Sequence, residues 1–82
     1  MSRLIFKIVT PEKLVLQEEA DQVSLPTPSG EITILQNHMP LVSMLSAGEI
    51  ILKRDGLEIP LATSGGFLKV SNNEVTDRKS VV

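Results

Sequence analysis

Turn-forming residues interrupt this chain at short and regular intervals, and this spacing constrains its fold more than any other feature of the sequence. Proline, glycine, asparagine and aspartate recur about every eight to twelve residues, and short runs rich in valine, isoleucine and leucine lie between them. Such intervals are too short for alternating strands and helices, and they are typical of β-sandwiches. The spacing therefore predicts an all-β chain, a small antiparallel β-sandwich of about eight to ten short strands.

Apolar alternation and short apolar runs mark the candidate strands. They are residues 4–9, 14–16, 22–25, 32–34, 41–45, 49–53, 57–61, 67–70 and 74–76. The segment from Glu12 to Gln22 also contains residues that favour a helix. Pro11 and the valine-rich segments on either side leave room for little more than two helical turns, so strand is predicted there as well.

Two turn signals are specific enough to predict local geometry. Asp55-Gly56 fits the two-residue type I′ turn of a hairpin, because both central positions of that turn need a positive φ. Pro60 cannot donate a ladder hydrogen bond, so the strand that follows this turn is predicted to lie at a sheet edge or to be bulged. Gly65 and Gly66 predict a corner between strands with a close backbone approach.

Size and composition narrow the class of protein. A single domain of 82 residues buries only about 60% of the surface that its unfolded chain exposes, so its core is thin. The sequence has two phenylalanines and no tryptophan or tyrosine, so that core is aliphatic. Cysteine is absent, which excludes disulfides and thiolate metal sites and leads us to expect a reducing compartment.

The charge pattern argues against nucleic acid as a partner. The net charge is -2, the eight lysines and arginines are scattered singly, and the few aromatic residues provide no stacking platform for bases. The apolar runs are also far shorter than the roughly 20 residues that span a bilayer, and the start lacks the apolar core of a signal peptide. We therefore expect no membrane insertion.

No residue pattern predicts catalysis or a bound cofactor or metal. His38 is the single histidine, and with no cysteine or nucleophile-elbow serine to accompany it, neither a triad nor a zinc site can be assembled. Ser64-Gly65-Gly66 lacks the Lys-Ser/Thr ending of a phosphate loop and precedes a strand. Glu18, Glu19 and Asp21 lack the ordered oxygen spacing of a calcium loop, which favours a solvated acidic turn.

Several apolar residues fall on the second register of their strands or in turns. They are Ile5, Val9, Leu35, Met39, Met44 and Ile51. Two interpretations remain open for them, contact with a protein partner or ordinary packing on a second face.

Four ordered motifs resemble the amino-terminal domain of the epsilon subunit of F-type (rotary) ATP synthases. Ile8-Val9-Thr10-Pro11-Glu12 matches a V-T/S-P-E/D turn, and residues 30–41, GEITILQNHMPL, align without gaps with G-E-x-G-I-L-P-x-H-A-P-L. Residues 48–53 match a G-x-L/I-x-I/L-x hairpin, and residues 64–70 match S-G-G-F-L-x-V in full. The similarity covers about residues 4 to 76, with departures at Thr33, Gln36 and Met39, where the family usually has Gly, Pro and Ala.

The resemblance implies a non-catalytic subunit of the central rotor in a proton-transporting ATP synthase, without a cofactor, that links the gamma subunit to the membrane c-ring. It implies that Ser29, Gly30 and Glu31 contact the polar loops of the c-ring. It also implies a gamma-subunit contact through Thr10, His38, Met39, Leu41 and Ser43. The expected location is peripheral, at the cytoplasmic face of the bacterial plasma membrane, with membrane association only through the complex.

The alternative is a free-standing β-sandwich that binds a ligand or peptide. Such a module would place aromatic residues along a concave face, and Phe6 and Phe67 are the two available. A deep lined cleft would favour this alternative, whereas flat patches would favour the rotor subunit.

The last six residues, 77–82, do not fit the family pattern. Relatives continue after Glu74-Val75-Thr76 as V/I-L-A-D-x-A and then form two helices, whereas this chain reads DRKSVV. One back-translation of those residues, GAT CGG AAG AGC GTC GTG followed by TAG, matches a common sequencing-adapter sequence. We therefore expect the native domain at residues 1–76 and a non-native tail at 77–82.

Overall fold

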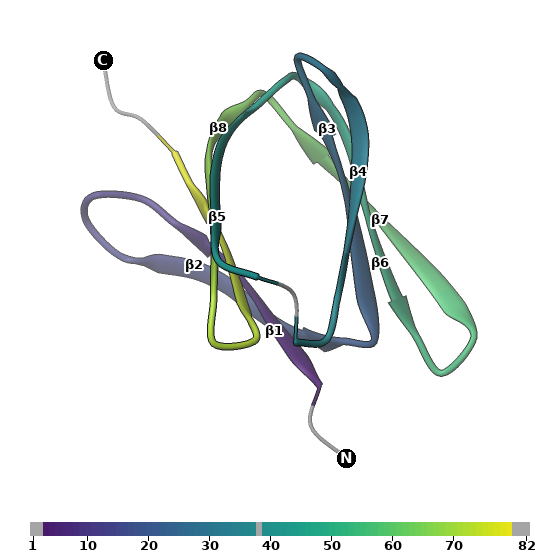
Figure 1. The fold of residues 1–82 in the computed structure, drawn as a ribbon. Helices are drawn as coiled ribbons and strands as arrows, with labels where there is room; N and C mark the ends of the chain where they lie inside the picture. Colours follow the sequence, from purple (N-terminus) through teal and green to yellow (C-terminus); the bar gives the residue numbers. More distant parts are fainter. Residues whose placement is uncertain (1–2, 38, 80–82) are drawn as a thin grey trace.

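The computed structural model describes residues 3–37 and 39–79, which form nine strands. Figure 1 shows them as two facing layers. The strands are β1 (Leu4–Val9), β2 (Leu14–Ala20), β3 (Gln22–Thr27), β4 (Gly30–Leu35), β5 (Leu41–Leu45), β6 (Gly48–Arg54), β7 (Leu57–Thr63), β8 (Gly66–Ser71) and β9 (Glu74–Arg78). The predicted β-sandwich and its number of strands are confirmed.

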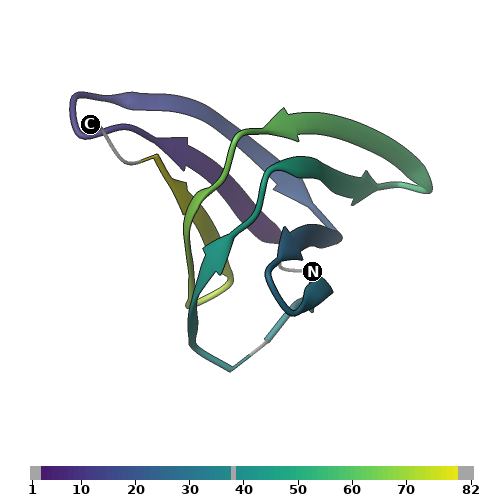
Figure 2. The ribbon, with the colours of Figure 1, turned by 90° about the horizontal axis from the view of Figure 1, so that it is seen from above.

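One layer is a five-stranded sheet in the order β2-β1-β9-β8-β5, and the other is a four-stranded sheet in the order β4-β3-β6-β7. Neighbouring strands pair antiparallel except β1 and β9, which pair in parallel from Ile5↔Glu74 to Val9↔Arg78. The hairpins β1–β2 and β6–β7 extend in opposite directions from the common body (Figures 1 and 2).

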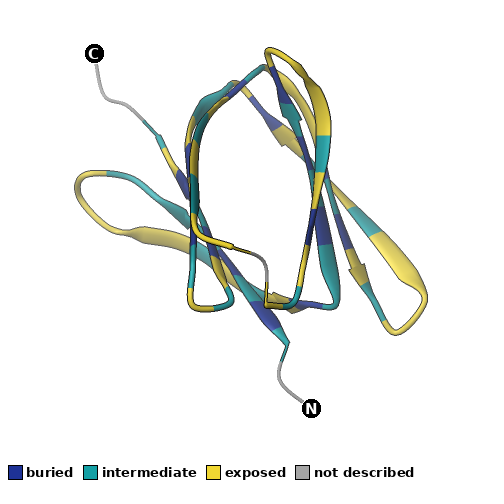
Figure 3. Cartoon of the chain, viewed as in Figure 1, coloured by how far each residue is buried: buried dark blue, intermediate teal, exposed yellow. Residues whose placement is uncertain are grey.

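The core lies between the two sheets, and buried residues alternate with more exposed ones along most strands (Figure 3), as the period of two residues in a strand requires. Its fully buried members come from both layers, so each sheet covers the apolar face of the other. They are Leu4, Phe6, Ala20, Val23, Leu25, Ile34, Ile50, Leu52, Leu68 and Val75, with Leu45 and Val70 almost as deeply buried. The cluster is aliphatic apart from Phe6, as the composition predicted.

The predicted turns are confirmed by their backbone angles. Asp55 and Gly56 have φ values of 54° and 80°, as a type I′ turn between β6 and β7 requires. Asn72 and Asn73 join β8 to β9 with φ values of 51° and 60°, and asparagine tolerates this region better than most residues. Pro60 lies on β7, an edge strand, as predicted.

The glycine corner between β7 and β8 is also confirmed. Gly65 has φ 108°, and a Cβ there would lie 3.1 Å from the backbone oxygen of Leu45. Gly66 has φ 144°, and a Cβ there would lie 2.6 Å from the backbone oxygen of Arg78. Two backbones therefore approach this corner at distances that a side chain would prevent.

Several strands are longer than the sequence predicted. β2 continues to Ala20, beyond the predicted end at residue 16, and β3 continues through Pro26 to Thr27, beyond the predicted end at residue 25. Pro26 lies beyond Ser24, where the pairing of β3 with β6 ends, so its missing N–H leaves no gap in that ladder. β9 continues through Asp77 and Arg78, two residues into the segment predicted to be non-native.

Candidate interaction surfaces

The segment Ser29–Gly30–Glu31 lies at the β3–β4 turn, which Figure 1 shows at the top of the view. All three residues are exposed. Gly30 has φ 117°, and its carbonyl accepts a hydrogen bond of 2.6 Å from the hydroxyl of Thr27. This hydrogen bond stabilises the turn, and Glu31 at the turn is exposed to solvent.

The β4–β5 connection crosses between the two sheets at the other end of the sandwich, at the bottom of Figure 1. The backbone N–H of Asn37 donates a 2.7 Å hydrogen bond to Oδ1 of Asn73, which ties the connection to the β8–β9 turn. Met39 is one of the most exposed apolar residues of the chain. His38 was also predicted for a contact here, and it lies outside the described residues.

Strand β5 carries two of the predicted gamma-contact residues, Leu41 and Ser43, but neither is fully exposed. Leu41 is half-buried and packs against the core, and the Ser43 hydroxyl lies 3.3 Å from the backbone oxygen of Met44. The exposed residues of this strand are Val42 and Met44. Sequence reasoning did not select Val42, because β5 is apolar on both registers and its pattern therefore does not show which residues point outward.

Thr10 lies apart from the other predicted contact residues. It closes the β1–β2 turn, where its N–H donates to the Lys13 carbonyl at 2.9 Å and its hydroxyl lies 3.2 Å from both the N–H and the carbonyl oxygen of Lys13. Three strand spacings separate β1 from β5 in the sheet, or roughly 14 Å at 4.7–4.9 Å per spacing. One partner must span the sheet to contact both places.

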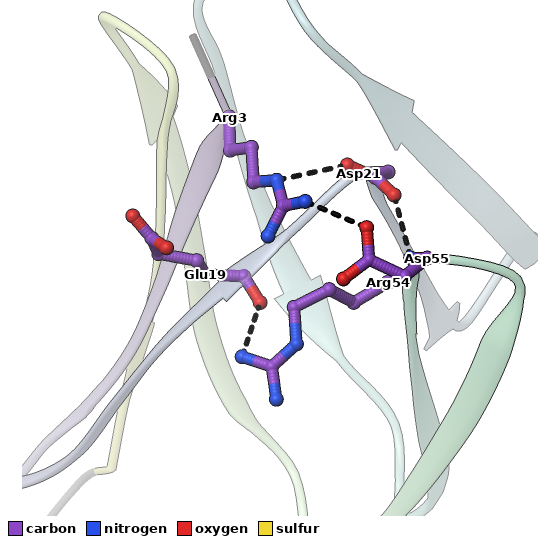
Figure 4. Close-up of polar contacts among 5 residues, drawn as sticks. All are labelled: Arg3, Glu19, Asp21, Arg54 and Asp55. Atoms are coloured by element: carbon purple, nitrogen blue, oxygen red, sulfur yellow. Dashed lines mark hydrogen bonds and ion pairs between the residues drawn. The ribbon is translucent and has the colours of Figure 1, made fainter. Parts of the chain in front are cut away.

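Two sets of polar contacts join the segments around Arg3, residues 18–21 and residues 54–55 (Figure 4). Arg3 contacts Asp55 at 2.7 Å and Asp21 at 3.4 Å, and Oδ2 of Asp21 accepts the Asp55 N–H at 2.9 Å. Arg54 lies 3.4 Å from the Glu18 carboxylate and from the Glu19 carbonyl. The carboxylates of Glu18, Asp21 and Asp55 therefore pair with arginines. Within residues 3–37 and 39–79 there is no group of three side chains that could hold a metal ion.

A hollow of about 330 Å³ lies on the outer face of the five-stranded sheet. Its lining is mainly polar and is crossed by the Lys7–Glu74 ion pair of 3.3 Å. Neither phenylalanine lines it, since Phe6 is buried in the core and Phe67 lies elsewhere on the sheet. The hollow lacks the aromatic wall that the ligand-binding alternative requires.

Among the described residues no helix is long and apolar enough to cross a membrane.

The chain matches a family of known proteins over most of its length. Residues 3–76 match the family model described as the β-sandwich domain of the ATP synthase delta/epsilon chain. The ATP synthase epsilon chain of Desulfitobacterium hafniense is 50% identical over 70 residues, which are 85% of this chain and 53% of the relative. That of Gloeobacter violaceus is 44% identical over 73 residues, which are 89% of this chain and 55% of the relative.

Solved structures share the fold. A chain in the mitochondrial ATP synthase of Euglena gracilis, solved with OSCP, F1 and the c-ring, superposes with a TM-score of 0.83 at 24% identity over 94% of this chain and 50% of that one. A chain in the central stalk and c-ring of the Tetrahymena thermophila enzyme superposes with a TM-score of 0.74 at 15% identity, over 98% of this chain and 65% of that one. The chain spans about half the length of the curated relatives it matches.

Proposed function

Since the chain belongs to the family of ATP synthase delta/epsilon-chain β-sandwich domains, we propose that it is a non-catalytic subunit of the central rotor of a proton-transporting ATP synthase and links the gamma subunit to the c-ring. The observation that carries this proposal is the family match over residues 3–76. A two-layered sandwich with a continuous core suits the transmission of torque, because rotation needs a stiff body with two contact patches rather than a reactive group.

The c-ring contact is proposed at Ser29, Gly30 and Glu31. The support is geometric: the turn is exposed and is held by the hydrogen bond from Thr27 to Gly30. A carboxylate at its tip complements basic loop residues, and such a charge pair sets orientation and association rate more than final affinity.

The gamma-subunit contact is proposed at the β4–β5 connection and β5, with Thr10 as a separate point across the sheet. Met39 supports this placement because it is largely exposed. The β4–β5 connection lies at the end of the molecule opposite the β3–β4 turn (Figure 1). Two patches at opposite ends allow one subunit on each side. In this arrangement the protein is peripheral at the cytoplasmic face of the bacterial plasma membrane and reaches the membrane only through the complex.

The first test is binding of the 82-residue chain to the gamma subunit from the same genome, measured by titration calorimetry. We expect one-to-one binding. A chain that is folded by circular dichroism and shows no heat of binding would overturn the rotor proposal.

The c-ring contact is tested with Glu31→Lys on a gamma–c-ring subcomplex in detergent. Reversing the charge should slow association roughly threefold to tenfold at low salt and weaken its salt dependence. Glu58→Lys is the matched control, since Glu58 is also exposed and lies on β7, away from this turn. Equal association rates for the two variants would contradict the assignment of Glu31.

A further inference from the structure

Strand β5 leaves one of its two edges open. It is the outermost strand of the five-stranded sheet and pairs with β8 from Leu41↔Val70 to Leu45↔Gly66. Within the part of the chain that the structure describes, no strand pairs with its other edge. A row of backbone N–H and C=O groups at such an edge is a template for an added strand.

The other three edge strands carry features that hinder pairing, and β5 does not. β2 carries the carboxylates of Glu18 and Glu19. Its pairing with β1 is also irregular, because the register shifts between Ile8 and Val9 of β1. β4 carries Glu31, and β7 carries Glu58 and Pro60. The sequence of β5 is LVSML, with no charge and no proline, and its pairing with β8 is regular. Natural sheets protect an edge unless something covers it.

Exposed apolar side chains lie beside this edge. Val42 is 71% exposed, Met44 is 56% exposed, and Phe67, which pairs with Met44 across the β5–β8 ladder, is 49% exposed. We call these three residues the β5 face. Lys69 is paired with Val42 in the ladder, is exposed, and makes no ion pair with another described residue. An apolar partner with a carboxylate near Lys69 would complement this surface.

The free edge has defined ends. Pro40 precedes β5 and lacks an N–H, and after β5 the N–H of Ser46 donates to the Pro26 carbonyl of the other sheet at 3.0 Å. The backbone available for pairing is therefore the five residues of β5.

A second copy of this chain fits the edge poorly. Two five-residue strands joined edge to edge would place the two β5 faces side by side without covering them. Such a contact falls short of the roughly 1,000 Å² that a specific interface needs. A larger partner can supply a strand and also cover the face.

We propose that an extended segment of the gamma subunit adds to the five-stranded sheet along β5, with apolar side chains over the β5 face and a carboxylate near Lys69. This inference rests on the proposed function and specifies how the gamma contact is made. Main-chain hydrogen bonds would supply affinity and the alternating apolar side chains would supply specificity, as in other cases of β-strand addition.

Hydrogen exchange of the 82-residue chain, alone and with the gamma subunit, tests the backbone part of the proposal. The β5 amides that point away from β8 should become protected at least about tenfold on binding, because each gains a hydrogen-bond partner. Binding with unchanged exchange throughout β5 would overturn strand addition. Protection of β5 without the gamma subunit, together with a dimer in sedimentation, would identify a second copy as the occupant and would equally overturn the proposal.

Side-chain variants test the β5 face. Met44→Glu should weaken gamma binding at least about tenfold, since it places a charge opposite Phe67 in an apolar contact. The matched control is Leu57→Glu, because Leu57 is 69% exposed on β7 of the other sheet, away from both proposed gamma-contact points. Equal affinities of the two variants would overturn the inference, whereas a wild-type chain that does not bind at all would instead overturn the proposed function.

Discussion

Replacement of Gly66 by alanine is expected to lower the free energy of unfolding by about 3 kcal/mol. The added Cβ would lie 2.6 Å from the backbone oxygen of Arg78 and 3.0 Å from Oδ1 of Asp77. The φ of 144° is also a conformation that alanine rarely adopts. Backbone on β9 must therefore move away from β8, and the melting temperature should fall by roughly 10–20 °C for a domain of this size.

Gly56→Ala is the control that separates steric clash from backbone strain. Gly56 also has a positive φ, of 80°, but nothing lies within 4 Å of the position of its Cβ. Its replacement should cost about 1 kcal/mol, the strain of a left-handed alanine alone. Chemical denaturation of both variants measures the difference. Losses of equal size would show that the close approach of β8 and β9 at Gly66 does not limit the side chain there.

The fold was predictable from sequence because its signals are local. Strand 41–45 was predicted with its observed bounds, and Asp55-Gly56 has the turn geometry that its residue types require. The parallel pairing of β1 with β9 was not predicted, since it joins segments almost a full chain length apart and no local pattern encodes that partnership. Strand ends were missed for a related reason, because a residue such as Pro26 is tolerated only where the neighbouring strand has ended its pairing.

The candidate surfaces were less predictable than the fold. The β5 sequence, LVSML, has apolar residues on both faces of the strand. Sequence alone therefore could not assign Leu41 to the core and Val42 to the surface. The family resemblance pointed to Leu41 and Ser43, whereas exposure selects Val42 and Met44, together with Phe67 from a different strand. Which residues share a face depends on the β5–β8 register, and that register forms only when the sheet is assembled.

Asp77 is the residue that fits its surroundings least well. It is fully buried, points to the same side of β9 as the core residue Val75, and lies between Ile8 of β1 and Leu68 of β8. Nζ of Lys79 lies 3.0 Å from its Oδ2, but neither carboxylate oxygen accepts a hydrogen bond of good geometry within the described residues. An apolar residue would suit this position better than a carboxylate.

Replacement of Asp77 by valine is therefore expected to raise the free energy of unfolding by about 2 kcal/mol, because exchange of a buried ion pair for an apolar side chain is often stabilising by this amount. The melting temperature should rise by roughly 10 °C. Glu74→Val is the control on the exposed side of the same strand and should change stability by no more than about 0.5 kcal/mol. A less stable Asp77→Val variant would mean that the carboxylate is held by interactions that the fold needs.

The pH dependence of stability tests whether Asp77→Val stabilises the fold by removing a buried charge. Burial raises the pKa of Asp77 above its ordinary value of 3.8, and the nearby Lys79 opposes part of that rise. The folded chain therefore holds the Asp77 proton more tightly than the unfolded chain does. As a result, ionisation of Asp77 lowers the free energy of unfolding. This decrease begins as pH rises through about 4 and is complete above the raised pKa. The stability gained by Asp77→Val should accordingly be small at pH 3 and largest at neutral pH. A gain that is constant across this range would show that the variant acts through packing volume, and not by removing a buried charge.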